Sequence, residues 1–114
     1  MGIQGALVAI ARHAVTEDSF ALMNGLGQLL DGQAKYEEAL TWYEKALAGF
    51  VEKGEEENTA ATYNNMAIVY KKQGEYTKAL AFYEKALAIK LEALGPDHPE
   101  TASTYNNMAI VYTK

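Results

Sequence analysis

The chain has 114 residues, of which 49% are hydrophobic and 22% are charged, a balance that excludes a disordered polypeptide and allows one small domain. Its formal net charge of −5 argues against a protein that tracks nucleic-acid phosphates, and the absence of cysteine excludes disulfides, thiolate metal sites and cysteine nucleophiles. No apolar run is long enough to cross a membrane, so we expect a cytoplasmic protein with no membrane or nucleic-acid partner.

The N-terminal stretch, "MGIQGALVAIARHAV", is mildly apolar. It lacks the basic region that opens a secretory signal, and Ala6 stands where a myristoylation signal requires serine or threonine. We therefore predict an ordinary leading helix near Ile3 to Ala14, inside a leading segment of residues 1–17.

Residues 18–57 carry two apolar stripes with the helical spacing i, i+3, i+4, i+7, which predicts a first pair of helices. The first stripe consists of Met23, Leu26, Gly27 and Leu30. The second stripe consists of Tyr36, Ala39, Leu40, Tyr43, Ala46, Leu47 and Phe50.

Residues 58–98 repeat this arrangement and predict a second pair of helices. Gly74 separates the two stripes and suits the turn after a helix end, and Gly95 ends the second stripe. The first stripe consists of Tyr63, Met66, Ala67 and Tyr70, and the second of Tyr76, Ala79, Leu80, Tyr83, Ala86 and Leu87.

Residues 99–114 begin a third copy and predict one more helix. In the connector "GPDHPE" we expect Asp97 to cap this helix, Glu100 to complete a capping box and Pro99 to stand in the first turn.

The nonapeptide "TYNNMAIVY" occurs at Thr62 to Tyr70 and again at Thr104 to Tyr112, forty-two positions further on. A unit that recurs in this way cannot bury its apolar face without a neighbour of its own kind. No segment alternates with a period of two residues, so we predict an all-α chain of stacked helix pairs.

The pattern Tyr63-x-x-Met66-Ala67-x-x-Tyr70, followed by Ala79, Tyr83 and Ala86, resembles the tetratricopeptide repeat. The connector and helix "LGPDHPETASTYNNMAIVY" are more specifically similar to the 42-residue repeats of kinesin light chains. The period alone would also suit HEAT or armadillo arrays, but small residues at the expected helix crossings favour the tetratricopeptide family.

This resemblance covers about Ser19 to Lys114. It implies a right-handed αα-hairpin solenoid, the tetratricopeptide superhelix, with about six helices. It also implies a scaffold or adaptor that binds a protein or peptide partner in the concave groove lined by the first helix of each pair.

By this resemblance, one face of each first helix would line the groove, and stacked repeats would align Asn24, Asn64 and Asn106 into a ladder of amides. The residues on this face are Asn24, Gln28 and Asp31 in the first copy, Asn64, Ile68 and Lys71 in the second, and Asn106, Ile110 and Thr113 in the third. The neighbouring candidates are Asn65, Lys72 and Asn107.

An amide side chain both donates and accepts hydrogen bonds, so a ladder of amides could pair with the backbone of an extended peptide. Lys71 and Lys72 could attract an acidic or C-terminal group on that peptide. Alternatively, one asparagine of each adjacent pair bridges neighbouring helices instead of contacting a ligand.

Self-assembly is the alternative function. Met108, Ala109 and Tyr112 form an apolar stripe whose covering helix is missing from the sequence pattern. The chain could be part of a longer array, the leading helix could cover the stripe, or another copy could cover it by exchange or dimer contact. We favour the last of these, which gives a homo-oligomer. We expect no enzyme, because serine, histidine and aspartate residues do not converge on a catalytic motif. We also expect no cofactor and no metal site.

Overall fold

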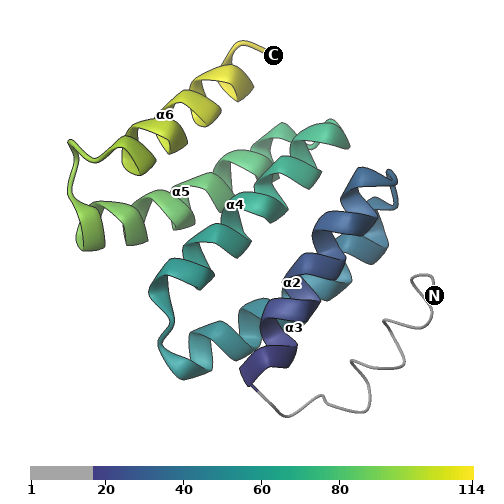
Figure 1. Cartoon of the computed structure of the whole chain (residues 1–114). Coiled ribbons are helices and arrows are strands. Elements are labelled where there is room, and N and C mark those ends of the chain that lie inside the picture. The colour runs from purple at the N-terminus through teal and green to yellow at the C-terminus, as the bar shows by residue number, and fades with distance from the viewer. Residues whose placement is uncertain (1–16) are drawn as a thin grey trace. The chain divides into compact units, whose positions relative to one another are not determined.

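The computed structural model describes residues 17–114, in which the chain forms five helices and no strand (Figure 1). The predicted leading helix near residues 3–14 lies outside the described residues. The helices are α2 (Glu17–Gly32), α3 (Tyr36–Lys53), α4 (Glu56–Lys72), α5 (Tyr76–Leu94) and α6 (Pro99–Tyr112). The chain divides after Gly54 into two compact units, one with α2 and α3 and the other with α4, α5 and α6.

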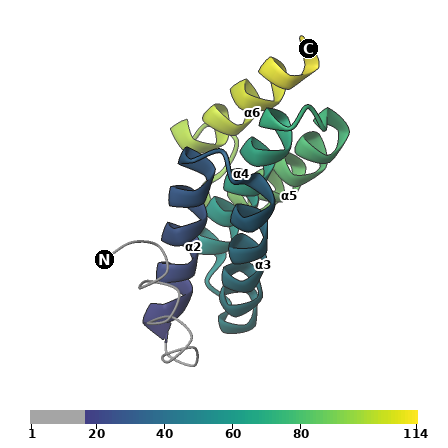
Figure 2. The ribbon, with the colours of Figure 1, turned by 90° about the vertical axis from the view of Figure 1, so that its right-hand side faces the viewer.

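In the first unit, α2 and α3 pack side by side as an antiparallel pair (Figure 2). The predicted stripes face each other, because Met23, Leu26 and Leu30 of α2 are buried, as are Tyr43 and Phe50 of α3. Burying side chains of this size removes water from apolar surface and supplies the main driving force for the pairing.

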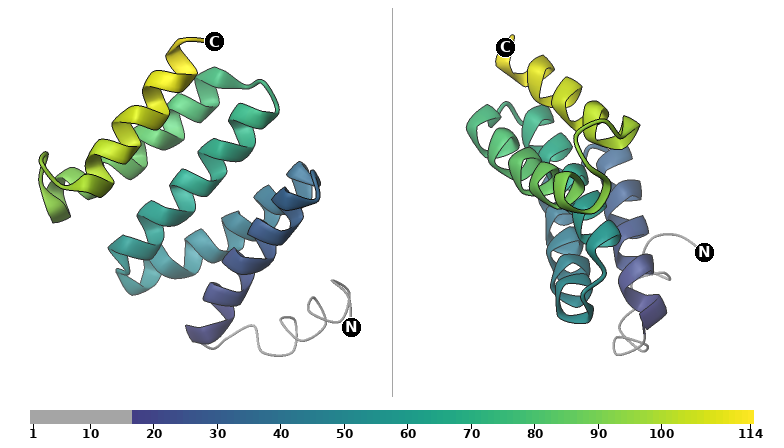
Figure 3. Two further views of the ribbon diagram at one scale, coloured as in Figure 1. Left: turned by 45° about the horizontal axis from the view of Figure 1, so that its top comes forward. Right: turned by 90° about the vertical axis from the view of Figure 1, so that its left-hand side faces the viewer.

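In the second unit, α5 packs against both α4 and α6, and each helix runs antiparallel to the one before it (Figure 3). The core cluster contains Ala67 of α4, Ala79 and Tyr83 of α5, and Val111 of α6. The small side chains of Ala67 and Ala79 leave room for the Tyr83 ring, which is fully buried.

Phe82 extends this core, because its ring stacks on Tyr70 at 5.2 Å between centroids and lies 6.0 Å from the Tyr63 ring. All three rings belong to the α4–α5 pair. Aromatic contacts of this kind add stability beyond the area that they bury.

The two turns inside the helix pairs have the same hydrogen bonds, although their sequences differ. The N–H of Lys35 donates to the Leu30 carbonyl, and the N–H of Glu75 donates to the Tyr70 carbonyl, both at 2.9 Å. Each turn has one left-handed residue, Gly74 in the second pair as predicted and Ala34 in the first. Glycine adopts this conformation without a Cβ clash, whereas alanine does so at a cost.

The expected cap of α6 is wrong by one residue. The N-cap is His98, whose Nδ1 accepts a hydrogen bond from the Glu100 N–H at 3.1 Å, and the side chain of Asp97 does not cap the helix. Glu100 therefore stands two residues after the cap instead of three, so no capping box forms. Pro99 occupies the first turn as predicted, where its missing N–H costs nothing.

Candidate functional site

The repeated nonapeptide lies on α4 in one copy and on α6 in the other, and identical side chains meet different surroundings. Ala67 is fully buried in the core cluster, whereas its equivalent Ala109 is exposed. Tyr70 is half-buried against Phe82, whereas its equivalent Tyr112 is 68% exposed. The difference arises because α5 covers this face of α4, while no described helix covers the same face of α6.

On α4, the residues predicted to line a groove are only partly accessible. Asn64, Ile68 and Lys71 are half-buried, and Ile68 packs against the core cluster. The Asn64 Oδ1 atom is buried and has no hydrogen-bond partner among the described residues. Asn65 is half-buried and Lys72 is exposed. Both residues already take part in a noncovalent interaction.

On α6, the equivalent residues are more accessible. Asn106 is exposed and the Ile110 side chain is 47% exposed, whereas Asn107 is half-buried. The Thr113 hydroxyl donates to the Ile110 carbonyl at 2.7 Å and so satisfies the last turn of the helix. We use the name amide face for Asn64, Ile68 and Lys71 of α4 together with Asn106, Ile110 and Thr113 of α6.

On α2, the predicted groove residues have mixed environments. Gln28 is exposed, and Asn24 is half-buried with an interaction of its own. Asp31 is half-buried. The pKa of Tyr43 is raised mainly by the burial of that tyrosine, and the nearby negative charge of Asp31 raises it further. The predicted ladder of Asn24, Asn64 and Asn106 includes residues of both units, and it stays a prediction.

The apolar stripe predicted for self-association is only partly uncovered. Ala109 and Tyr112 are exposed, and Tyr105, which the sequence reasoning did not select, is 48% exposed on the same side of the helix. Met108 differs, because it is half-buried and packs against the core cluster. We therefore define the open face of α6 as Tyr105, Ala109 and Tyr112.

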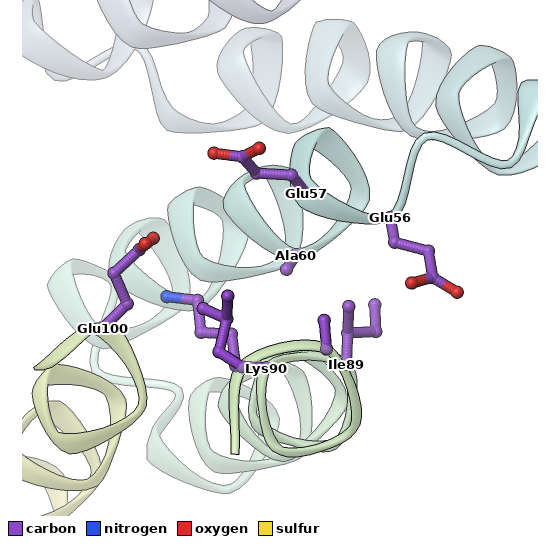
Figure 4. A pocket seen from close by; sticks show the side chains of 8 residues that line it. Glu56, Glu57, Ala60, Ile89, Lys90 and Glu100 are labelled. Atoms are coloured by element: carbon purple, nitrogen blue, oxygen red, sulfur yellow. The ribbon is translucent and has the colours of Figure 1, made fainter. Parts of the chain in front are cut away.

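A pocket of about 260 Å³ lies in the second unit between the first turns of α4 and the second half of α5 (Figure 4). Its apolar lining consists of Ala60, Ile89, Ala93 and Leu94, and its charged lining of Glu56, Glu57, Lys90 and Glu100. Lys90 Nζ donates to the Thr104 hydroxyl at 3.2 Å, which ties α5 to α6 beside the pocket.

Sequence reasoning missed this pocket, although the repeat itself carries a signal for it. At the equivalent place in the first unit, the rings of Phe20 and Phe50 meet edge to face at 6.3 Å. Forty residues further on, these positions are occupied by Ala60 and Lys90, which do not fill the space. The loss of the two phenyl rings leaves a hollow, although Ile89, which stands in place of Gly49, takes up part of the space.

Among residues 17–114, no group of three side chains is arranged to hold a metal ion. A membrane-spanning helix is likewise not found among the helices that the structure describes.

Comparison with known proteins gives two matches to family models described as tetratricopeptide repeat. One covers residues 58–114, which is half of the chain, and the other covers residues 20–52. No curated protein matches the chain.

Among solved structures, the chain is similar to BtubC (BKLC) from P. vanneervenii, with 27% sequence identity and a TM-score of 0.81. The match covers 95% of this chain and 45% of that protein, so the chain spans less than half the length of this relative. The predicted all-α fold of helix-pair repeats is thereby confirmed.

Proposed function

The chain belongs to the tetratricopeptide repeat family, a family of protein–protein interaction modules, and on that premise we propose that it binds an extended segment of a partner protein along the amide face. Within this proposal the chain is a non-enzymatic scaffold or adaptor. Its partner is a protein or peptide, and no cofactor is required.

The observation that carries this proposal is the accessibility of Asn106 and Ile110 on α6. An exposed isoleucine next to an exposed amide offers an apolar contact and a hydrogen-bonding pair at the same place. Extended peptides need this combination, because their backbone groups must exchange water for protein partners while one side chain in two points at the surface.

Asn64 and Lys71 extend the surface onto α4 of the same unit. A buried carbonyl oxygen without a donor is costly, and the Asn64 Oδ1 atom is in that state among the described residues. A peptide N–H that reached this oxygen would supply the missing donor. Lys71 would favour an acidic group in the peptide.

The test is a peptide-array screen followed by calorimetric titration of the strongest peptide. We expect the double variant Asn64→Ala/Asn106→Ala to lower affinity by about tenfold or more, because two hydrogen bonds are removed. Thr77→Ala on α5 is the matched control, since it removes an exposed polar group away from the amide face. Unchanged affinity in the double variant would remove the amide face from the proposal.

Self-association through the open face of α6 is the second candidate function. It is favoured by Tyr105 and Tyr112, two large side chains that stay exposed although their equivalents Tyr63 and Tyr70 contact Phe82. A second copy is the proposed occupant, with α6 meeting α6, because a face that is apolar on one copy is apolar on the other.

Sedimentation of the wild-type chain over a wide concentration range tests this candidate. We expect a concentration-dependent dimer that Ala109→Glu abolishes and Ala88→Glu, at an exposed position of α5, leaves intact. A wild-type chain that stays monomeric at every concentration would rule out this second function without affecting peptide binding.

A further inference from the structure

We propose that the pocket between α4 and α5 receives an aromatic side chain that stands between basic residues in a partner protein. This site is separate from the amide face, and it shares no residue with it. The proposal therefore adds a second recognition element to a binding module.

The shape of the pocket argues for an aromatic side chain. In the first unit, the equivalent space holds the Phe20 ring, which meets Phe50 and presses against Gly49. In the second unit, Ala60 stands in place of Phe20 and Ile89 in place of Gly49, so the hollow keeps an apolar floor but has a different outline. A phenyl ring from outside would pack on Ala60 and Ile89 and return an aromatic side chain to a space that holds one in the other copy.

The burial of the pocket floor also favours an aromatic side chain as the occupant. Ala60 is buried and Ile89 is half-buried, so a ring placed between them loses most of its contact with water. Ala93 is exposed at the edge and small enough to leave the entrance open. The volume of about 260 Å³ accommodates one aromatic side chain but not a drug-sized ligand.

The charges at the rim argue for basic neighbours. Glu56 and Glu57 reach the pocket from α4 and Glu100 from α6, on different sides of the hollow (Figure 4). The one lysine in the lining, Lys90, already donates to the Thr104 hydroxyl. The rim is therefore net negative, and it favours a partner with lysine or arginine on either side of the aromatic residue.

The experiment uses the full chain, labelled with ¹⁵N, and three synthetic peptides: acetyl-Lys-Phe-Lys-amide, acetyl-Lys-Ala-Lys-amide and acetyl-Glu-Phe-Glu-amide. We expect the first peptide to give saturable shifts of the Ala60, Ile89 and Ala93 amide signals at millimolar concentration, because one anchored side chain supplies only modest affinity. The other two peptides should bind at least about fivefold more weakly, as each lacks either the ring or the charges.

Two variants place the interaction in the pocket. Ala60→Phe should place a ring in the hollow beside Ile89 and abolish the shifts, and Ala93→Phe should block the entrance from an exposed position that tolerates a larger side chain. Ala88→Phe, which adds a ring at an exposed position away from the pocket, is the control and should leave binding unchanged.

Three outcomes would overturn the proposal: no saturable shift with acetyl-Lys-Phe-Lys-amide, equal binding of all three peptides, or unchanged binding in Ala93→Phe. Shifts confined to Asn106 and Ile110 would also overturn it, while supporting the amide face. The two proposals therefore fail separately.

Discussion

Gly27 of α2 lies directly against the Tyr43 ring of α3: a Cβ atom added to Gly27 would stand 2.5 Å from Tyr43 Cε1. The Tyr43 residue is 1% exposed, so its ring is enclosed by protein. At this crossing a residue without a Cβ atom fits against the ring where it stands. At the equivalent crossing in the second unit, Ala67 and Tyr83 lie in the core cluster, and the alanine is accommodated.

We expect Gly27→Ala to lower the free energy of unfolding of the first unit by about 1–2 kcal/mol, because overpacking outweighs the gain in helix propensity. Gly25→Ala is the matched control in the same helix, since a Cβ there meets no atom within 4 Å. It should raise stability by about 0.5–1 kcal/mol. Urea unfolding followed by circular dichroism measures both, and equal stability of the two variants would contradict the close crossing.

The repeated nonapeptide allows one substitution to be compared in two environments. Ala67→Glu places a carboxylate in the core cluster and should cost about 3 kcal/mol or more, whereas Ala109→Glu on the open face of α6 should change the stability of the monomer, measured at low protein concentration, by less than about 0.5 kcal/mol. Thermal unfolding of the two variants provides the measurement. A similar loss in both would mean that the open face is covered in solution.

The same comparison explains how far sequence could predict the fold. The helical spacing of the apolar side chains predicts which face of each helix is buried. Met23, Tyr43 and Tyr83 are buried as that spacing requires. Residue spacing alone does not show whether another helix covers that face, so the spacing around Ala67 and Ala109 is identical although Ala67 is buried and Ala109 is exposed. The sequence distinguishes them only by the second apolar stripe that follows Ala67 and has no counterpart after Ala109.

The candidate site was predictable in part for a related reason. The residues of the amide face could be selected because they repeat on one side of the first helices, but the greater exposure of Asn106 depends on its neighbours. The pocket depends on the size of facing side chains rather than on their polarity. Phe20 and Ala60 are both apolar, and whether each leaves a hollow depends on the size of the facing side chains, Gly49 and Phe50 in one unit and Ile89 and Lys90 in the other.

The two left-handed turn residues predict opposite effects of exchanging alanine and glycine. Ala34 has φ +60° and Gly74 has φ +79° at equivalent turns. We expect Ala34→Gly to raise the free energy of unfolding by up to about 1 kcal/mol and Gly74→Ala to lower it by about 1 kcal/mol, because a Cβ strains this conformation. Chemical denaturation of the two variants tests this, and a destabilising Ala34→Gly would contradict it.

The buried tyrosines predict a loss of stability at alkaline pH. Burial raises the pKa of Tyr43 and Tyr83 above the ordinary value of 10.0, and the charge of Asp31 raises the pKa of Tyr43 further. Below pH 10 both tyrosines are protonated in the folded and unfolded chain, so their contribution is complete. Above pH 10 the unfolded chain loses these protons first, and stability should fall by up to about 1.4 kcal/mol per pH unit for each tyrosine.

Tyr83→Phe removes the hydroxyl and keeps the ring, so it separates the contributions of these two groups to stability. The Tyr83 hydroxyl is buried and has no hydrogen-bond partner among the described residues, so its removal should leave stability at neutral pH unchanged or raise it by about 1 kcal/mol. The variant should also lose stability less steeply above pH 10. Denaturation at pH 7 and pH 11 provides both values, and a marked loss at pH 7 would show that the hydroxyl has a partner.

The N-cap of α6 predicts that His98 contributes more to stability than the adjacent Asp97 does. His98 Nδ1 accepts the Glu100 N–H, so His98→Ala leaves that donor without its side-chain partner and should lower stability by about 0.5–1 kcal/mol. Asp97→Ala should change it by less than about 0.5 kcal/mol, because the exposed Asp97 side chain does not cap the helix.

His98→Asp is the third member of this set, because a carboxylate is a stronger cap than an imidazole and also interacts favourably with the helix dipole. It should restore or exceed wild-type stability, which shows that the loss in His98→Ala comes from the missing acceptor. Thermal unfolding of the three variants ranks them. If Asp97→Ala were the more damaging substitution, α6 would begin one residue earlier in solution, with the capping box that the sequence suggests.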